Sequence, residues 1–259
     1  MIGYLLVLLL FMTGCATNPY SKFYTDNTAG MNIEKSGKFI IPTEPPVLLK
    51  GNDIQGDGIR MLEDGYALLG FSYFNAGSAD DDSAIEHAKQ VHAASVILYS
   101  HFTHTKSGAL PLSVPNTQTS TTQLSIGNYS GTANTTTHGR QTIMMPYSVD
   151  KYDYAATYWI RRNAIQFGAV IKPLTDEQRQ KLQSNKGLQI IAVVKNTPAF
   201  FADILRGDIL RSIGERDTYD FDTFEDAIRE SQGKSVKVVI YRNGHELTKD
   251  VRLKDSIPE

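Results

Sequence analysis

The chain has 259 residues, of which 41% are hydrophobic and 21% are charged. A chain of this length and composition forms a core and allows two modest domains, so a wholly disordered protein is excluded. The 26 Lys and Arg residues nearly balance the 28 Asp and Glu residues, which argues against nucleic acid as a partner. The single cysteine allows neither an internal disulfide nor a thiolate metal site.

The chain begins with an apolar run, Leu5 to Met12, of the length of a secretory signal. Residues 1–14 are therefore predicted to be a signal peptide. Met12-Thr13-Gly14-Cys15 resembles the lipobox of bacterial lipoproteins. The resemblance implies that Cys15 is diacylated and becomes the first residue after the signal peptide is cleaved off. The resemblance also implies sorting to the periplasmic face of the outer membrane, because the residue after the cysteine is Ala16 and not Asp, and an Asp there would prevent this sorting. An ordinary cleaved signal or an uncleaved anchor is the alternative.

Residues 15–46 are polar and rich in Pro, Gly, Ser and Thr, with one short apolar run at Phe39-Ile40-Ile41. We interpret this segment as a lipidated tether. Part of it is expected to pack on the first domain, because Phe23 and Tyr24 are large groups to leave in water.

Residues 47–158 are predicted to form a small α/β domain. A strand at 66–74, a helix that begins at the acidic run 80–82 and a strand at 95–99 follow one another, and a further strand covers about 152–160. The Ser/Thr-rich segment 107–142 between the last two strands predicts a long polar hairpin or a mobile loop.

No catalytic or metal-binding pattern is found in this part of the chain. His101 and His104 stand three apart on a predicted strand and so point to opposite faces. His87 and His92 are expected on the exposed side of the helix. A dinucleotide-binding loop is not expected at Gly56-x-Gly58, because the third glycine and the following helix of that motif are missing. We expect no metal, no cofactor and no enzymatic activity.

Residues 159–255 are predicted to form a second domain of short strands and two helices. Thr175 and Gln178 have the spacing of a capping box. Asp222 is expected to cap the second helix, and Asn243-Gly244 is typical of a hairpin turn.

The second domain resembles the PDZ domains attached to bacterial envelope trypsin-like proteases. The resemblance is carried by Thr197-Pro198-Ala199, Ala202-Asp203-Ile204, Gly207-Asp208 and Arg242-Asn243-Gly244. Asp203 stands where this family often has Gly, and Asp tolerates the left-handed conformation better than most residues. The resemblance implies an α+β chain in which a small α/β domain precedes a PDZ domain, a partly open barrel of short strands capped by two helices.

The same resemblance implies a peptide-binding groove. Its carboxylate-binding loop matches Phe167-Gly168-Ala169, its strand continues through Val170 and Ile171, and its far wall is formed by Phe224, Ala227 and Ile228. Plain core packing is the alternative for the helix residues. Arg161 and Arg162 either add positive charge near the carboxylate or lie at a solvated strand end. A Gly168→Val substitution is expected to abolish binding with little loss of fold.

These patterns predict a membrane-anchored envelope lipoprotein that binds peptide segments or C-termini of partner proteins, as an adaptor or scaffold. The first alternative is a structural assembly subunit whose groove is closed. The second is an accessory of a serine protease. A protease itself is not expected, since the first domain, residues 47–158, has only about 110 residues and a trypsin-like domain needs about 200.

Overall fold

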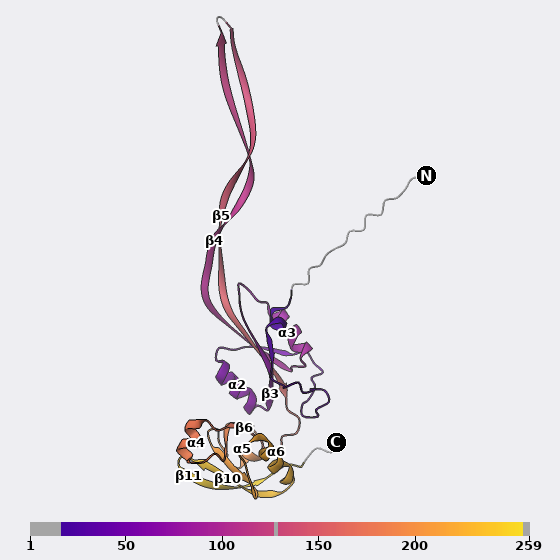
Figure 1. Ribbon diagram of the computed structural model, residues 1–259. Coiled ribbons are helices and arrows are strands. Elements are labelled where there is room, and N and C mark those ends of the chain that lie inside the picture. Colours follow the sequence, from indigo (N-terminus) through magenta and orange to yellow (C-terminus); the bar gives the residue numbers. More distant parts are fainter. Residues whose placement is uncertain (1–16, 127–128, 256–259) are drawn as a thin grey trace, which may run out of the picture. The chain divides into compact units, whose positions relative to one another are not determined.

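The computed structural model describes residues 17–126 and 129–255 (Figure 1). Cys15 and the predicted signal peptide, residues 1–14, lie outside the described residues. Within the described ranges, no helix is both long enough and apolar enough to cross a membrane.

The first part of the chain builds a five-stranded sheet in the order β1-β3-β5-β4-β2. β1 pairs antiparallel with β3, and β2 pairs parallel with β4. The strands are β1 (Tyr24–Asp26), β2 (Val47–Lys50), β3 (Tyr66–Ala76), β4 (Ser95–Ile126) and β5 (Tyr129–Arg161). The helices are α1 (Pro19–Lys22), α2 (Ile54–Glu63) and α3 (Asp81–Gln90). This agrees with the small α/β unit predicted from the sequence.

The predicted tether contributes to this folded unit. α1 places Tyr20 in the core at 1% exposure, against the ring of Phe74, and β1 extends the sheet. Further along the chain, Phe39 forms an isolated antiparallel β-bridge with Arg162. Residues 18–26 and 37–40 therefore pack on folded structure, as the large aromatic groups suggested.

Two expectations for the helices of this unit are wrong. Gly56 and Gly58 lie inside α2, although no helix was expected there, because Met61 on α2 packs with Tyr99 and Trp159 and outweighs the low helix propensity of glycine. His87 is buried at 4% exposure, with its ring against Tyr24 and Tyr158, and is not on a solvated face.

The Ser/Thr-rich segment 107–142 lies almost entirely within β4 and β5, which form a long twisted ribbon (Figure 1). Of the two alternatives, a polar hairpin or a mobile loop, the structure shows the hairpin. Residues 75–78 and 101–153 make up a separate compact unit, in which the Asn75 amide donates to Asp153 and the Thr105 hydroxyl to Asp150.

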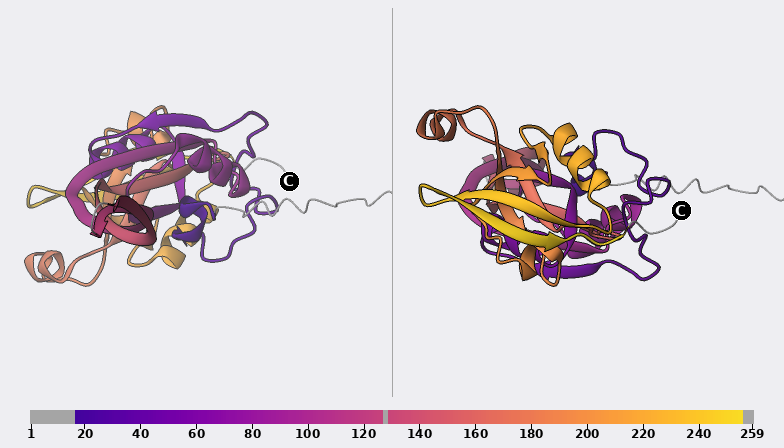
Figure 2. Two further views of the ribbon diagram at one scale, coloured as in Figure 1. Left: turned by 90° about the horizontal axis from the view of Figure 1, so that it is seen from above. Right: turned by 90° about the horizontal axis from the view of Figure 1, so that it is seen from below.

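The second domain is built on a second sheet, in the order β11-β10-β8-β7-β6, with β9 paired to β8. The strands are β6 (Ala169–Pro173), β7 (Leu188–Val193), β8 (Ile209–Ile213), β9 (Arg216–Asp217), β10 (Ser235–Arg242) and β11 (His245–Arg252). The helices are α4 (Asp176–Leu182), α5 (Pro198–Phe201) and α6 (Phe221–Glu230). β10 and β11, the yellow strands in Figure 2, pair along their whole length. The described sheet does not close into a barrel, and the predicted α+β class is confirmed.

Local sequence signals determine where several of these elements begin and turn. The capping box of Thr175 and Gln178 is confirmed at the start of α4. Asn243 and Gly244 turn β10 into β11 with positive φ angles of 51° and 91°. The cap of α6 is Asp220 and not Asp222, because the Asp220 carboxylate accepts from the backbone N–H of Thr223.

Candidate functional site

A groove lies between β6 and α6. β6 is the last strand of its sheet, and it pairs only with β7 among the described strands, so its outer edge is free to accept another strand. A cavity of about 420 Å³ opens between this strand and α6. An edge strand beside an apolar cavity is the arrangement by which a sheet can bind an extended peptide.

The loop before β6 contributes to the lining of the groove. Gly168 has a φ of +101°, which a residue with a side chain rarely adopts. Its carbonyl accepts from the N–H of Val194 at 2.8 Å, and the carbonyl of Phe167 accepts from Ala199 at 2.8 Å. No described residue accepts a hydrogen bond from the N–H of Gly168. This N–H is therefore a free donor in the lining of the groove.

The close packing around Gly168 contradicts the expectation that a Gly168→Val substitution would cost little stability. A Cβ at this position would overlap the side chain of Thr197, which is 3% exposed and donates to the carbonyl of Val194 at 2.6 Å. The loop therefore has close packing behind it. A Gly168→Val substitution is expected to destabilise the fold as well as change the groove.

The predicted groove residues divide into two sets. Six of them line the cavity: Phe167, Gly168, Ala169, Val170, Phe224 and Ile228. The other two, Ile171 and Ala227, are buried in the core cluster of the domain at 7% and 1% exposure and do not line the cavity. Of the three helix residues, Ala227 is therefore the one whose position agrees with the alternative of plain core packing, and a peptide-binding role for the predicted groove residues stays a prediction.

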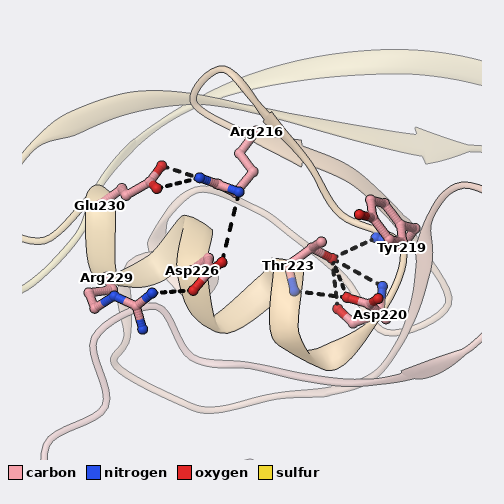
Figure 3. A network of polar contacts seen from close by, with 7 residues as sticks. All are labelled: Arg216, Tyr219, Asp220, Thr223, Asp226, Arg229 and Glu230. Atoms are coloured by element: carbon pink, nitrogen blue, oxygen red, sulfur yellow. Dashed lines mark hydrogen bonds and ion pairs between the residues drawn. The ribbon is translucent and has the colours of Figure 1, made fainter.

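The helical wall makes polar contacts at both of its ends (Figure 3). At the start of α6, the hydroxyl of Thr223 accepts from the N–H of Tyr219 and of Asp220, each at 3.1 Å. Near its end, Arg216 of β9 pairs with Glu230 and lies 3.8 Å from the carboxylate of Asp226. The capping contacts satisfy backbone donors at the start of α6, and the ion pairs near its end are exposed and contribute little to stability.

The charged groups that line the cavity are mainly cationic. In the described part of the chain they are Lys38, Arg162 and Arg229, against a single carboxylate, Glu225. Arg162 has a buried Nε with no hydrogen-bond partner among the described residues, and burial lowers the pKa of its guanidinium. Arg161 points elsewhere, since it donates to the hydroxyl of Tyr66 at 3.1 Å. Of the two arginines considered from the sequence, Arg162 is the one at the cavity.

Two cavity residues come from a part of the sequence in which no groove residue was predicted. Lys38 and Phe39 belong to the segment that we interpreted as a tether, and both line the groove. The only sequence signal was the short apolar run that begins at Phe39, which stands out in an otherwise polar segment.

Residues from three of the family motifs, Asp203, Asp208 and Arg242, contact one another. Arg242 donates from Nε to Oδ1 of Asp208 at 2.6 Å and from Nη2 to the other carboxylate oxygen at 2.8 Å. Asp203 has a φ of 56°, so the left-handed turn expected at this position is present without Gly. Arg242 also donates to the carbonyl of Asp203 at 2.8 Å, which ties this turn to β10.

Comparison with known proteins identifies the domain. The family model of the PDZ domain matches residues 168–253. The chain therefore contains a C-terminal PDZ domain, preceded by the α/β unit. No curated protein sequence matches the chain.

Solved structures with similarity to the chain include HtrA-type proteases. One is the HtrA-type protease AlgW with a decapeptide, at 19% identity over 40% of this chain and 38% of AlgW, with a TM-score of 0.31. The HtrA3 PDZ domain bound to a phage-derived ligand is 17% identical over 34% of this chain and 83% of that domain, with a TM-score of 0.30. A PDZ domain protein from Parabacteroides distasonis is 10% identical over 91% of this chain and 70% of that one, with a TM-score of 0.21. The chain thus spans about two fifths of the length of AlgW.

Proposed function

We propose that this protein is a membrane-anchored envelope lipoprotein that binds peptide segments or C-termini of partner proteins through its PDZ groove, as an adaptor or scaffold. The observation that carries the proposal is the cavity between the unpaired edge of β6 and helix α6. A peptide that adds to this edge gains backbone hydrogen bonds along its length and places its side chains against α6.

A terminal carboxylate has suitable partners in the lining of the groove. The N–H of Gly168 has no acceptor among the described residues, and Arg162, which carries a guanidinium, lines the same cavity. Both groups are donors, and a charged donor strengthens a hydrogen bond to a carboxylate. The chemistry thus favours a peptide that ends in the groove over an internal segment.

The structural alternative, a groove closed by the protein itself, is less well supported. No described strand pairs with the outer edge of β6, and a cavity of about 420 Å³ lies beside it. We propose a non-enzymatic role, because the sequence of the preceding domain offers no catalytic triad.

Peptide binding is tested with the full chain and a set of fluorescein-labelled peptides that end in a free carboxylate, followed by fluorescence anisotropy. Saturable binding to one or more peptides supports the function. Failure of all peptides, with a protein shown to be folded, would contradict it. Incubation with casein provides a second readout, since cleavage that scales with this protein would contradict a non-enzymatic role.

Anchoring is tested separately by labelling cells with radioactive palmitate. The wild-type chain is expected to incorporate label, and the Cys15→Ala variant is not. Equal labelling of both would mean that Cys15 is not the lipidated residue, and the peptide-binding part of the proposal would be unaffected.

A further inference from the structure

We propose that Lys38 and Phe39 form a third wall of the peptide groove and help to determine which C-terminal side chain it accepts. This inference rests on the proposed function and extends it. Both residues come from the segment before the α/β domain, outside residues 168–253 that match the PDZ family. The groove is thus composite, made from two distant parts of the sequence.

Backbone pairing holds this segment in place. The N–H of Asn163 donates to the carbonyl of Lys38 at 2.8 Å, and the N–H of Ile40 donates to the carbonyl of Arg161 at 3.0 Å. The side-chain amide of Asn163 adds a bond to the carbonyl of Gly37 at 3.0 Å. These bonds fix the segment a few residues before the loop that lines the groove.

A side-chain contact links the same segment to the opposite wall. The ammonium of Lys38 lies 3.7 Å from Oε1 of Glu225 on α6, and both residues line the cavity. Both side chains are more than half exposed, so the ion pair is weak and screened by salt. Glu225 is the one acidic residue among the described residues that line the cavity.

The pairing pattern indicates a wall and not a plug. A segment that blocked the groove as a pseudo-ligand would add to the free edge of β6. Instead, the backbone of Phe39 pairs with that of Arg162 in an isolated β-bridge. The outer edge of β6 is not paired with any of the described strands. The position for an added peptide strand is therefore left open.

Phe39 determines the chemistry of the proposed ligand. It lines the same cavity as Phe224 and Ile228, so it adds a large apolar residue to the lining contributed by the PDZ domain. A large apolar side chain at the peptide terminus buries more surface there than a small one. The groove should therefore prefer peptides that end in Phe or Leu over peptides that end in Ala.

The test compares variants of the full chain with four peptides that are identical except for a terminal Phe, Leu, Val or Ala. The Phe39→Ala variant is expected to lose affinity by about tenfold for the Phe and Leu peptides and by less than about twofold for the Ala peptide, since truncating an anchor residue acts on the side chain that fills its pocket. Fluorescence anisotropy measures the affinities. The Ile40→Ala variant is the matched control, because Ile40 lies in the same segment, is 48% exposed and does not line the cavity.

If Phe39→Ala does not fold, the Phe39→Leu variant replaces it, because it keeps an apolar side chain at this position. It is expected to shift the preference of the groove from the peptide that ends in Phe toward the peptide that ends in Leu. If wild type binds but all four peptides keep their relative affinities in both variants, the third wall is contradicted and the proposed function stands. If the folded wild type binds none of the peptides, the proposed function itself fails and this inference fails with it.

Discussion

The rings of Phe167 and Phe224 lie with their centroids 6.2 Å apart and their planes tilted by 59°. Phe167 belongs to the loop before β6, and Phe224 belongs to α6. The two walls of the groove are therefore connected by an aromatic contact, so the shape of the cavity depends on the packing of the core beneath it.

This contact predicts that Phe224→Ala weakens both peptide binding and stability. Phe224 is partly buried, so we expect a loss of about 1–3 kcal/mol in the free energy of unfolding, below the cost of truncating a fully buried Phe. Urea unfolding and peptide binding measure the two effects. Phe221→Ala is the control, because Phe221 lies on the same helix and is 51% exposed. Equal effects of the two substitutions would contradict a role for Phe224 in the groove.

The second prediction separates the two constraints on Gly168. Gly168→Ala introduces both an unfavourable positive φ and an overlap with Thr197, whereas Gly207→Ala introduces only the positive φ of 97°, with open space around its Cβ. We expect about 1 kcal/mol of destabilisation at Gly207 and at least about 2 kcal/mol at Gly168. Thermal and urea unfolding compare them. A smaller cost at Gly168 would show that the loop is less closely packed than described.

The third prediction concerns the ion pair of Asp208 and Arg242. The Asp208 side chain is 2% exposed, and Arg242→Met would leave its carboxylate buried with one backbone donor, the N–H of Leu205. We expect a loss of about 3 kcal/mol in the free energy of unfolding, much of it recovered by adding Asp208→Asn. Arg216→Met is the control, since its ion pairs are exposed, and it should change stability little. An effect at Arg242 no larger than at Arg216 would contradict this account.

Local signals in the sequence predicted most of the second domain. The capping box at Thr175 and the turn at Asn243-Gly244 depend on neighbouring residues, and both are present. The left-handed turn at Asp203, which is also present, was expected from the family resemblance. The groove residues followed from the family resemblance, and six of eight line the cavity.

Tertiary contacts account for what the sequence did not predict. α2 contains two glycines that weaken a helix, and only its packing against Trp159 identifies it. Lys38 and Phe39 reach the groove through backbone bonds to residues more than 120 positions away, which no local pattern records. His87 lies on a short, charged helix, where its burial depends on Tyr24 and Tyr158 from other elements.

The fourth prediction is a pH dependence of stability that arises from His87. Burial lowers the pKa of its imidazole below the ordinary value of 6.5, and its Nε2 has no hydrogen-bond partner among the described residues. The unfolded chain then takes up a proton at higher pH than the folded chain, so the stability contributed by the neutral ring is present above about pH 6.5 and is lost as pH falls below it.

Urea unfolding between pH 5 and pH 8, with the His87→Phe variant for comparison, measures this effect. The variant should show a smaller fall in stability at low pH than wild type. His245→Gln, at an exposed position on β11, is the control and should leave the fall unchanged. An unchanged fall in the His87→Phe variant would assign the pH dependence to other groups.

The central claim is that the groove receives a peptide that ends in a free carboxylate. The most direct measurement is isothermal titration calorimetry of the full chain with one peptide in two forms, a free carboxylate and a C-terminal amide. Amidation is expected to weaken binding by at least about tenfold, because the N–H of Gly168 and the guanidinium of Arg162 lose a charged acceptor. Equal affinities of the two forms would contradict it, since the loop would then not be a carboxylate receptor.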